Sequence, residues 1–167
     1  EDSVGGPFSA DAVTTYSMDR LGRTTRIDDD LPTLNAVNPA DKTIDFTYDA
    51  AGRMKSIARS SVGGLFQLNT AFDYDGVGRL KKIDYTRPSV GTVASFDYQY
   101  DAASRLTDVD EFFGVSSASV NFKRDTDLYY DNAGRLVTRA TTLRSGHVNG
   151  FSVDDAFTLD AAGNRKT

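Results

Sequence analysis

A short motif recurs six times along this chain of 167 residues. Most copies have an aromatic residue, a variable residue, a second aromatic or apolar residue, Asp, two variable residues, Gly and Arg. The copies read YSMDRLGR from Tyr16, FTYDAAGR from Phe46, FDYDGVGR from Phe72, YQYDAASR from Tyr98, LYYDNAGR from Leu128 and FTLDAAGN from Phe157. Their Asp residues lie 30, 26, 26, 30 and 29 residues apart. This recurrence indicates a repeat protein in which each copy is one supersecondary unit.

The second copy shows how such a unit can fold. Phe46 and Tyr48 are two residues apart, so on a strand they share one face. Asp49 can accept hydrogen bonds from the backbone N–H groups that follow it, and the next two alanines suit the right-handed positions of a type I turn. Gly52 then supplies the left-handed residue of a G1 bulge. The motif therefore predicts a β-hairpin with a three-residue loop.

The Asp and Arg of each copy are expected to face each other across the hairpin and to set its register more than its stability. We expect the same turn at residues 19–23, 49–53, 75–79, 101–105, 131–135 and 160–164. Its residues are Asp19, Gly22, Arg23, Asp49, Gly52, Arg53, Asp75, Gly78, Arg79, Asp101, Ser104, Arg105, Asp131, Gly134, Arg135, Asp160 and Gly163. Ser104 replaces the turn Gly and Asn164 replaces the Arg, so the fourth and sixth units are expected to be weaker.

The outgoing strands of the hairpins contain an irregularity. Met54 and Ile57 are three residues apart, as are Leu106 and Val109, so neither pair can share a face on a straight strand. Either each outgoing strand carries a bulge, or both faces of the sheet bury apolar side chains.

The segments between the copies are rich in Gly, Pro, Ser and Asn, and they are expected to form second hairpin loops of variable length. No segment shows sustained helical periodicity. All but two of the 24 acidic residues are Asp, which disfavours helix interiors. The fold class predicted is all-β: six tandem antiparallel hairpins, about twelve strands, in one continuous twisted or spiralling strip that forms a single array over residues 1–167.

The aromatic residues of the motif recur in register. They are Tyr16, Phe46, Tyr48, Phe72, Tyr74, Tyr98, Tyr100, Tyr129, Tyr130 and Phe157. Packing in a core is the favoured interpretation, because large aromatic side chains stabilise a fold mainly through burial. An exposed ladder of such rings is the alternative, and it could stack on sugars.

Composition excludes several classes of partner. A net charge of -5 and a pI near 4.8, with no cluster of Lys and Arg, disfavour nucleic-acid binding. The chain has no Cys, hence no disulfide, and no apolar run long enough for a membrane-spanning helix. It begins with Glu1 rather than Met, so we expect it to be a piece of a larger precursor.

The strings YDGVGRL from Tyr74 and YDNAGRL from Tyr130 resemble the YD repeat of the Rhs family. The resemblance covers six copies from Tyr16 onward. It implies a hairpin strip that spirals into a hollow shell, as in Rhs polymorphic toxins, the cocoon of insecticidal toxin complexes and the teneurin barrel. It also implies a bacterial protein that is secreted or exposed on the cell surface.

Two departures from the family pattern matter. Shells of this family contain many more repeats than six, and its toxin-bearing members end in an Asp-Pro-rich motif with catalytic Asp residues that release the toxin. This sequence has no Asp-Pro and ends LDAAGNRKT. The resemblance therefore implies shell material without the protease and without the toxin.

Chemistry elsewhere in the chain is weakly indicated. The single His, His147, has no evident nucleophile or orienting partner and is expected to be a solvated loop residue. The Asp residues at 28–30 and the pairs at 73 and 75, 108 and 110, and 125 and 127 suit calcium, but no calcium-loop motif is present. Such pairs are also typical of a polar sheet face. We predict no catalytic, metal-binding or cofactor-binding residue, and no enzyme activity.

Three hypotheses of function follow. The first is a structural segment that builds the wall of a shell or strip, and its partners are further repeats of the same precursor. The second is an extracellular fibre subunit whose copies join head to tail by strand addition, because only NRKT follows Gly163 to complete the last hairpin. The third is a carbohydrate-binding surface module.

Overall fold

The computed structural model describes residues 13–30, 42–61, 64, 66–114, 122–145 and 148–156, and within this part of the chain it is all-β. The chain divides into two compact units, Glu1–Thr70 and Ala71–Thr167. A single repeat array over residues 1–167 stays a prediction.

The first unit is an antiparallel sheet of two complete hairpins. Its strands are β1 (Val13–Met18), β2 (Thr24–Asp30), β3 (Lys42–Tyr48) and β4 (Met54–Ser61), and each pairs with its neighbour in the chain. The next strand, β5 (Gln67–Tyr74), crosses the division between the units after Thr70.

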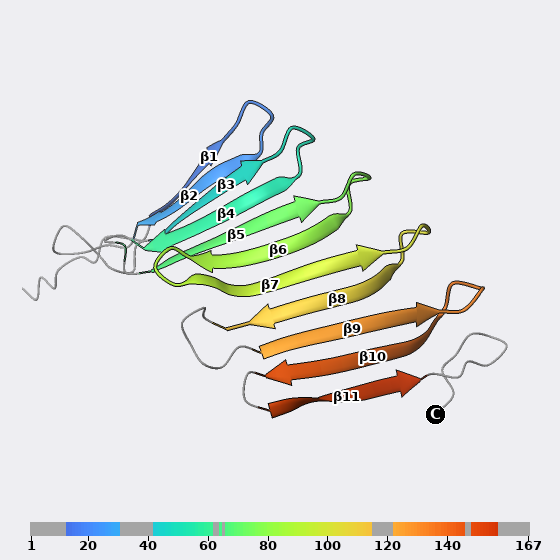
Figure 1. Ribbon diagram of the computed structural model, residues 1–167. Helices are drawn as coiled ribbons and strands as arrows, with labels where there is room; N and C mark the ends of the chain where they lie inside the picture. The colour runs from blue at the N-terminus through green and yellow to red at the C-terminus, as the bar shows by residue number, and fades with distance from the viewer. Residues whose placement is uncertain are drawn as a thin grey trace, which may run out of the picture. The chain divides into compact units, whose positions relative to one another are not determined.

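The second unit continues in the same way. Its remaining strands are β6 (Leu80–Arg87), β7 (Gly91–Tyr100), β8 (Leu106–Phe113), β9 (Phe122–Tyr130), β10 (Leu136–Ser145) and β11 (Val148–Ala156), again paired antiparallel in chain order. Eleven strands are thus described, and the twelfth expected strand falls on residues outside the described ranges. In each unit the motif turns lie at one end of the strands and the variable connections at the other (Figure 1).

A bulge in the outgoing strand of four hairpins explains the irregular spacing of the apolar residues there. Tyr48 pairs with Met54, but Thr47 pairs with Ser56, so Lys55 is an extra residue. Corresponding register shifts follow the turns at 19–23, 101–105 and 131–135. Because of the shift, Ile57, opposite Phe46, lies on the same face as Met54. The first of the two alternatives posed by the sequence is therefore correct for these four hairpins.

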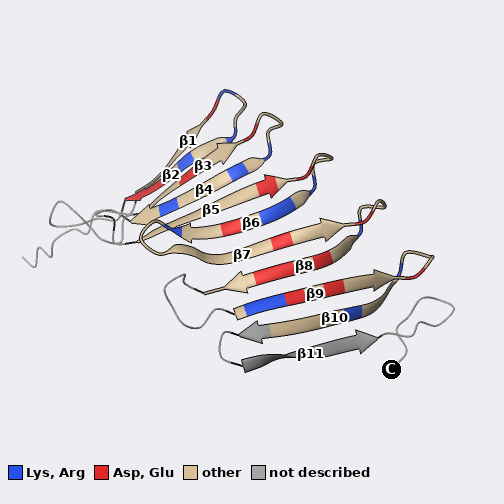
Figure 2. Ribbon diagram, in the orientation of Figure 1, with Lys and Arg blue, Asp and Glu red and all other residues tan. Residues whose placement is uncertain are grey.

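The two faces of the sheet differ in chemistry. In the first unit Ile44, Phe46, Tyr48 and Ile57 share one face, while the other carries a polar network in which the Arg26 guanidinium bonds Asp28 and contacts Asp45. In the second unit the apolar face carries edge-on ring contacts of Phe96 with Tyr85 and with Phe113. Charged residues occur along the strands in both units (Figure 2).

No apolar side chain is fully buried among the described residues, and the one buried polar residue there is Thr70, at 2% exposure. The prediction that the motif aromatics pack in a core is therefore wrong for those described: Tyr48, Tyr100 and Tyr130 are half-buried, and Tyr16 is 62% exposed. The physical reason is that the described strands of each unit form one sheet, and no other described element covers either of its faces. The described residues include no helix with the length and apolarity needed to cross a membrane.

Candidate functional site

The described copies of the motif turn share one backbone geometry. In each, the Asp N–H donates to the Arg carbonyl four residues on, and the N–H of the fourth turn residue donates back to the Asp carbonyl, at 2.9–3.0 Å. The fourth residue has positive φ in all five: Gly22 +77°, Gly52 +81°, Gly78 +94°, Ser104 +63° and Gly134 +78°. This is the three-residue loop with a left-handed residue that the sequence predicts. The sixth turn, with Asp160 and Gly163, lies outside the described residues.

The Asp side chain organises the turn. In the unit of Asp49, carboxylate Oδ1 accepts the N–H of Ala51 and the N–H of Arg53, both at 2.9 Å. Oδ2 accepts Arg53 Nε at 2.7 Å. Asp19, Asp75, Asp101 and Asp131 make the same three bonds in their own turns. One oxygen thus fixes the loop backbone while the other holds the Arg, which requires a short side chain with two acceptors.

These bonds favour the charged form of the Asp. Backbone and side-chain hydrogen bonds from Arg23 lower the pKa of Asp19, and Arg105 and Arg135 act likewise on the pKa values of Asp101 and Asp131. For the Asp residues at positions 49 and 75, burial is the largest single influence and raises the pKa, but the bonds from the turn Arg and backbone outweigh it. The turn Asp is therefore ionised at neutral pH.

Three of the turn Arg residues also contact the hairpin that follows them. The guanidinium of Arg23 lies 4.3 Å from the ring centroid of Tyr48, and the Tyr48 hydroxyl donates to the Thr24 carbonyl at 2.7 Å. In the second unit Arg79 lies over Tyr100 at 4.6 Å and Arg105 over Tyr130 at 4.7 Å. The hydroxyls of these tyrosines donate to the carbonyls of Leu80 and Leu106 at 2.8 and 2.7 Å. We call these paired contacts the Arg–Tyr ladder.

The ladder reaches the turn of the following hairpin as well. Arg79 Nη1 donates to the Asp101 carbonyl at 3.1 Å and to Ser104 Oγ at 3.2 Å. A Cβ added at Gly52 would meet Arg23 Nη1 at 3.4 Å. The Arg thus lies close to the left-handed residue, and the Ser hydroxyl in the fourth unit gives it a partner there.

The sequence identified the members of the ladder but not their contacts. The Arg of one copy contacts the Tyr of the next copy, up to 25 residues further along the chain. A connection of variable length lies between them, so no local sequence pattern predicts the contact. The other motif aromatics are placed differently. Phe46, Phe72, Tyr74 and Tyr98 are half-buried, Tyr129 is 53% exposed on the opposite face from Tyr130, and Phe157 lies outside the described residues.

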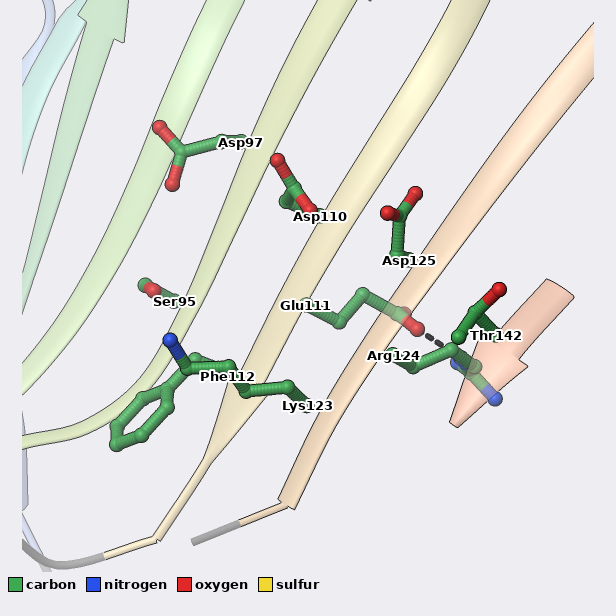
Figure 3. Close-up of a pocket in the computed structure, with 9 residues that line it drawn as sticks. All are labelled: Ser95, Asp97, Asp110, Glu111, Phe112, Lys123, Arg124, Asp125 and Thr142. Carbon is green, nitrogen blue, oxygen red and sulfur yellow. Dashed lines mark hydrogen bonds and ion pairs between the residues drawn. The ribbon is translucent and has the colours of Figure 1, made fainter. Parts of the chain in front are cut away.

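A row of carboxylates crosses the second unit on its polar face. Asp97 on β7 pairs with Asp110 on β8, which pairs with Asp125 on β9. Figure 3 shows these three carboxylates side by side on neighbouring strands. They line a hollow of about 450 Å³ together with Ser95, Phe112, Lys123 and Thr142. Glu111 and Arg124, which pair with each other, contribute to the same hollow.

Asp108 extends this group. One oxygen from each of Asp108, Asp110 and Asp125 lies within 4.8 Å of the others, and Asp127 is the direct partner of Asp108. Asp108 Oδ1 and Asp125 Oδ1 are buried and have no hydrogen-bond partner. Burial, followed by repulsion from the carboxylates of Asp110, Asp125 and Asp127, raises the pKa of Asp108 to about 6. We call Asp108, Asp110, Asp125 and Asp127 the acidic cluster; gathered acidic groups are no metal site by themselves, and none is assigned.

Three of the other Asp candidates have partners close by. Asp28 bonds Arg26 and accepts the Thr43 hydroxyl, Asp29 accepts the Thr14 hydroxyl, and Asp75 belongs to its turn. His147 lies outside the described residues. The structure brings the acidic pairs of β8 and β9 together, but it does not gather the remaining Asp candidates with them.

No family model and no curated protein matches the sequence. Among solved structures, a porin-like protein from Bacteroides uniformis is 10% identical over 89% of this chain and 90% of that chain, with a TM-score of 0.30. A TcdB2-TccC3 complex without its hypervariable C-terminal region is 14% identical over 92% of this chain, with a TM-score of 0.28. This chain spans 10% of that second chain. Similarity at this level supports no functional conclusion.

Proposed function

We propose that this chain is a non-enzymatic structural segment of a secreted or surface-exposed bacterial protein of the Rhs, or YD-repeat, type, and that it forms part of the wall of a shell or strip. Its partners in this proposal are further repeats of the same precursor. The proposal includes no cofactor, and its assignment to the family rests on the resemblance of the motif.

The Arg–Tyr ladder is the observation that carries the structural role. The recurrent polar residues of the motif are engaged in holding the turn and in joining one hairpin to the next, as Arg79 does when it binds its own Asp75, the ring of Tyr100 and the Asp101 carbonyl. Residues used in this way in turn after turn serve architecture rather than catalysis. A repeat unit that contacts its neighbours through identical contacts can be extended without limit, as a wall requires.

A truncation tests this role. If the chain is a repeat array, a variant that ends at residue 114 should keep its β-sheet circular dichroism signal and unfold with a smaller denaturant dependence, because less surface is exposed on unfolding. A second variant ends at residue 114 and also lacks β3 and β4, the second hairpin of the first unit. Its denaturant dependence should be smaller again. Complete loss of structure on the first truncation would instead indicate a closed domain and contradict the proposal.

A self-assembling fibre subunit is the second candidate, and the exposure of β1 favours it. All six residues of this strand are exposed, and among the described residues it pairs with β2 alone. An edge strand of this kind can accept a strand from a second copy of the chain, head to tail. The mass in solution separates the two candidates.

Carbohydrate binding has less support. Sugars stack on exposed aromatic faces, but one face of Tyr48, of Tyr100 and of Tyr130 already carries an Arg guanidinium. A glycan-binding screen tests this third hypothesis directly.

A further inference from the structure

The polar face of β7, β8 and β9 concentrates negative charge in the second unit. The register places Asp97, Asp110 and Asp125 in one transverse row, and Asp108 opposite Asp127 in the next. Directly opposed like charges on paired strands are destabilising. The sheet therefore holds these strands together against their own electrostatic repulsion.

Among the side chains that the structure describes, the positive charge on the polar face near the acidic cluster lies at its margins. Lys82 Nζ on β6 lies 3.2 Å from Asp84 and 4.0 Å from Asp97. Lys123 on β9 is two residues from Asp125, on the side of it away from Asp127. On β7, the residue opposite Asp108 is the uncharged Gln99. Asp108 forms no ion pair with any residue that the structure describes.

Two oxygens of the cluster lack the partners that buried carboxylates need. Oδ1 of Asp108 and Oδ1 of Asp125 are buried and accept no hydrogen bond, on strands that pair with each other. An ionised carboxylate in this position loses hydration without compensation, and its nearest neighbours repel it. Protonation of one carboxyl group removes one charge from the interior of the cluster and supplies an O–H donor beside acceptors.

We propose that the acidic cluster takes up one proton at mildly acidic pH, held mainly by Asp108, and that this proton strengthens the pairing of β8 with β9. The device is a pH-dependent clamp within the sheet, and it is independent of the proposed wall function. Because the four carboxyl groups interact, the proton belongs to the cluster as a whole.

The direction of the effect follows from proton linkage. The pKa of Asp108 in the folded chain is raised to about 6 from an ordinary 3.8, so between these values the folded state binds more protons than the unfolded state. Stability is therefore higher at pH 5 than at pH 7.5 and falls as the pH rises through about 6. The full shift would raise the unfolding equilibrium constant roughly tenfold over this interval. Because solvent reaches the rest of the side chain and weakens the effect, we expect a rise of about threefold.

Denaturant unfolding at about pH 5 and about pH 7.5 tests the proposal. The variants are Asp108→Asn, which is permanently uncharged, and Asp30→Asn, an exposed strand Asp of the first unit that serves as the matched control. Wild type and Asp30→Asn should be more stable at the lower pH, while Asp108→Asn should be nearly independent of pH and more stable than wild type at the higher one. Asp110→Asn keeps Asp108 but removes a repelling neighbour, and should move the transition to lower pH.

Two local readouts identify the origin of the effect. Hydrogen exchange should show greater protection of β8 and β9 amides at the lower pH, and the carboxyl carbon of Asp108 should titrate in NMR near pH 6. Equal stability of wild type at both pH values would overturn the proposal, as would an Asp108→Asn variant that keeps the wild-type pH dependence. Stabilisation by calcium chloride at about pH 7.5 that also abolishes the pH dependence would overturn it in favour of a cation site.

Discussion

The turn Asp residues are ionised, and hydrogen bonds within the turn stabilise their negative charge. Their pKa values are lowered by bonds from the turn backbone and Arg, so their contribution to stability is present above the ordinary Asp pKa and is lost as the pH falls through the lower folded value. The acidic cluster changes stability with pH in the opposite direction. The turn Asp residues and the acidic cluster thus respond to acid in opposite ways. Hydrogen-bond donors surround each turn Asp, whereas other carboxylates surround Asp108.

Substitutions of Asp131 separate the two tasks of its carboxylate. Asp131→Asn keeps an acceptor for the N–H groups of Ala133 and Arg135 but loses the charged oxygen that holds the guanidinium. Asp131→Ala loses both. At neutral pH we expect melting temperatures to decrease from wild type to Asn to Ala, and at about pH 2.5 we expect the Asn variant to approach wild type. Equal melting temperatures for Asn and Ala at neutral pH would show that the backbone bonds contribute nothing.

The left-handed turn position predicts a second set of effects. Gly78 has a φ of +94°, which a β-branched residue strongly resists, so Gly78→Val should destabilise the chain by more than about 1 kcal/mol. At Ser104, Gly relieves strain of roughly 1 kcal/mol, but the hydroxyl that accepts from Arg79 is lost. Ser104→Gly should therefore stabilise by less than the strain alone suggests, and Ser104→Ala, which keeps the strain, should destabilise. Denaturant midpoints in the reverse order would refute the turn geometry.

At the scale of the hairpin, the Arg–Tyr ladder is the contact to test. Tyr100→Phe keeps the ring beneath Arg79 but removes the bond to the Leu80 carbonyl, and should destabilise by about 0.5–1.5 kcal/mol. Tyr100→Leu also loses the cation–ring contact and should cost about 0.5–1 kcal/mol more. Tyr129→Phe is the control, because its side chain is 53% exposed on the opposite face. Chemical denaturation measures the stability of all three variants. If Tyr129→Phe were as destabilising as Tyr100→Phe, the ladder would contribute no more than any other Tyr contact.

The sequence predicted the turn and the hairpin well because both are local. Five consecutive residues such as Asp49 to Arg53 contain the acceptor, the left-handed residue and the cross-strand partner. The sequence predicts the bulge only as one of two alternatives, because the spacing of Met54 and Ile57 fits either a bulge or a sheet with two buried faces. Only the pairing of Thr47 with Ser56 in the structure establishes which strand carries the extra residue.

The contacts between hairpins could not be predicted in the same way. Asp97, Asp110 and Asp125 come from three strands, and their alignment depends on connections of different lengths. Each pair of Asp residues by itself has the appearance of an ordinary polar strand face. The exposure of the motif aromatics among the described residues could not be predicted either, because a pattern of alternating apolar residues predicts that one face is covered but not what covers it.

At the scale of the whole molecule, head-to-tail association of copies of the chain can be tested through the first and last copies of the motif. Within the array, a turn Arg stacks on the Tyr of the next hairpin, as Arg105 does on Tyr130. A junction between two copies would set Asn164 of the last unit against Met18, which occupies the Tyr position of the first. Such a junction could form backbone hydrogen bonds along β1, but it would lack the Arg–Tyr contact of the ladder.

Restoring the missing pair should therefore strengthen association. We expect the wild-type chain to associate weakly through the exposed β1 edge, and the double variant Met18→Tyr with Asn164→Arg to associate roughly fivefold more tightly, as a cation–ring contact of about 1 kcal/mol implies. Each single variant should remain near wild type, so the four proteins form a double-mutant cycle measured by sedimentation or light scattering. Because the contact is heterologous, the products should be rings or open filaments rather than two-fold dimers. Four strict monomers at high concentration, or a double variant no tighter than the sum of its singles, would exclude this junction and leave further repeats of a longer chain as the partner of β1.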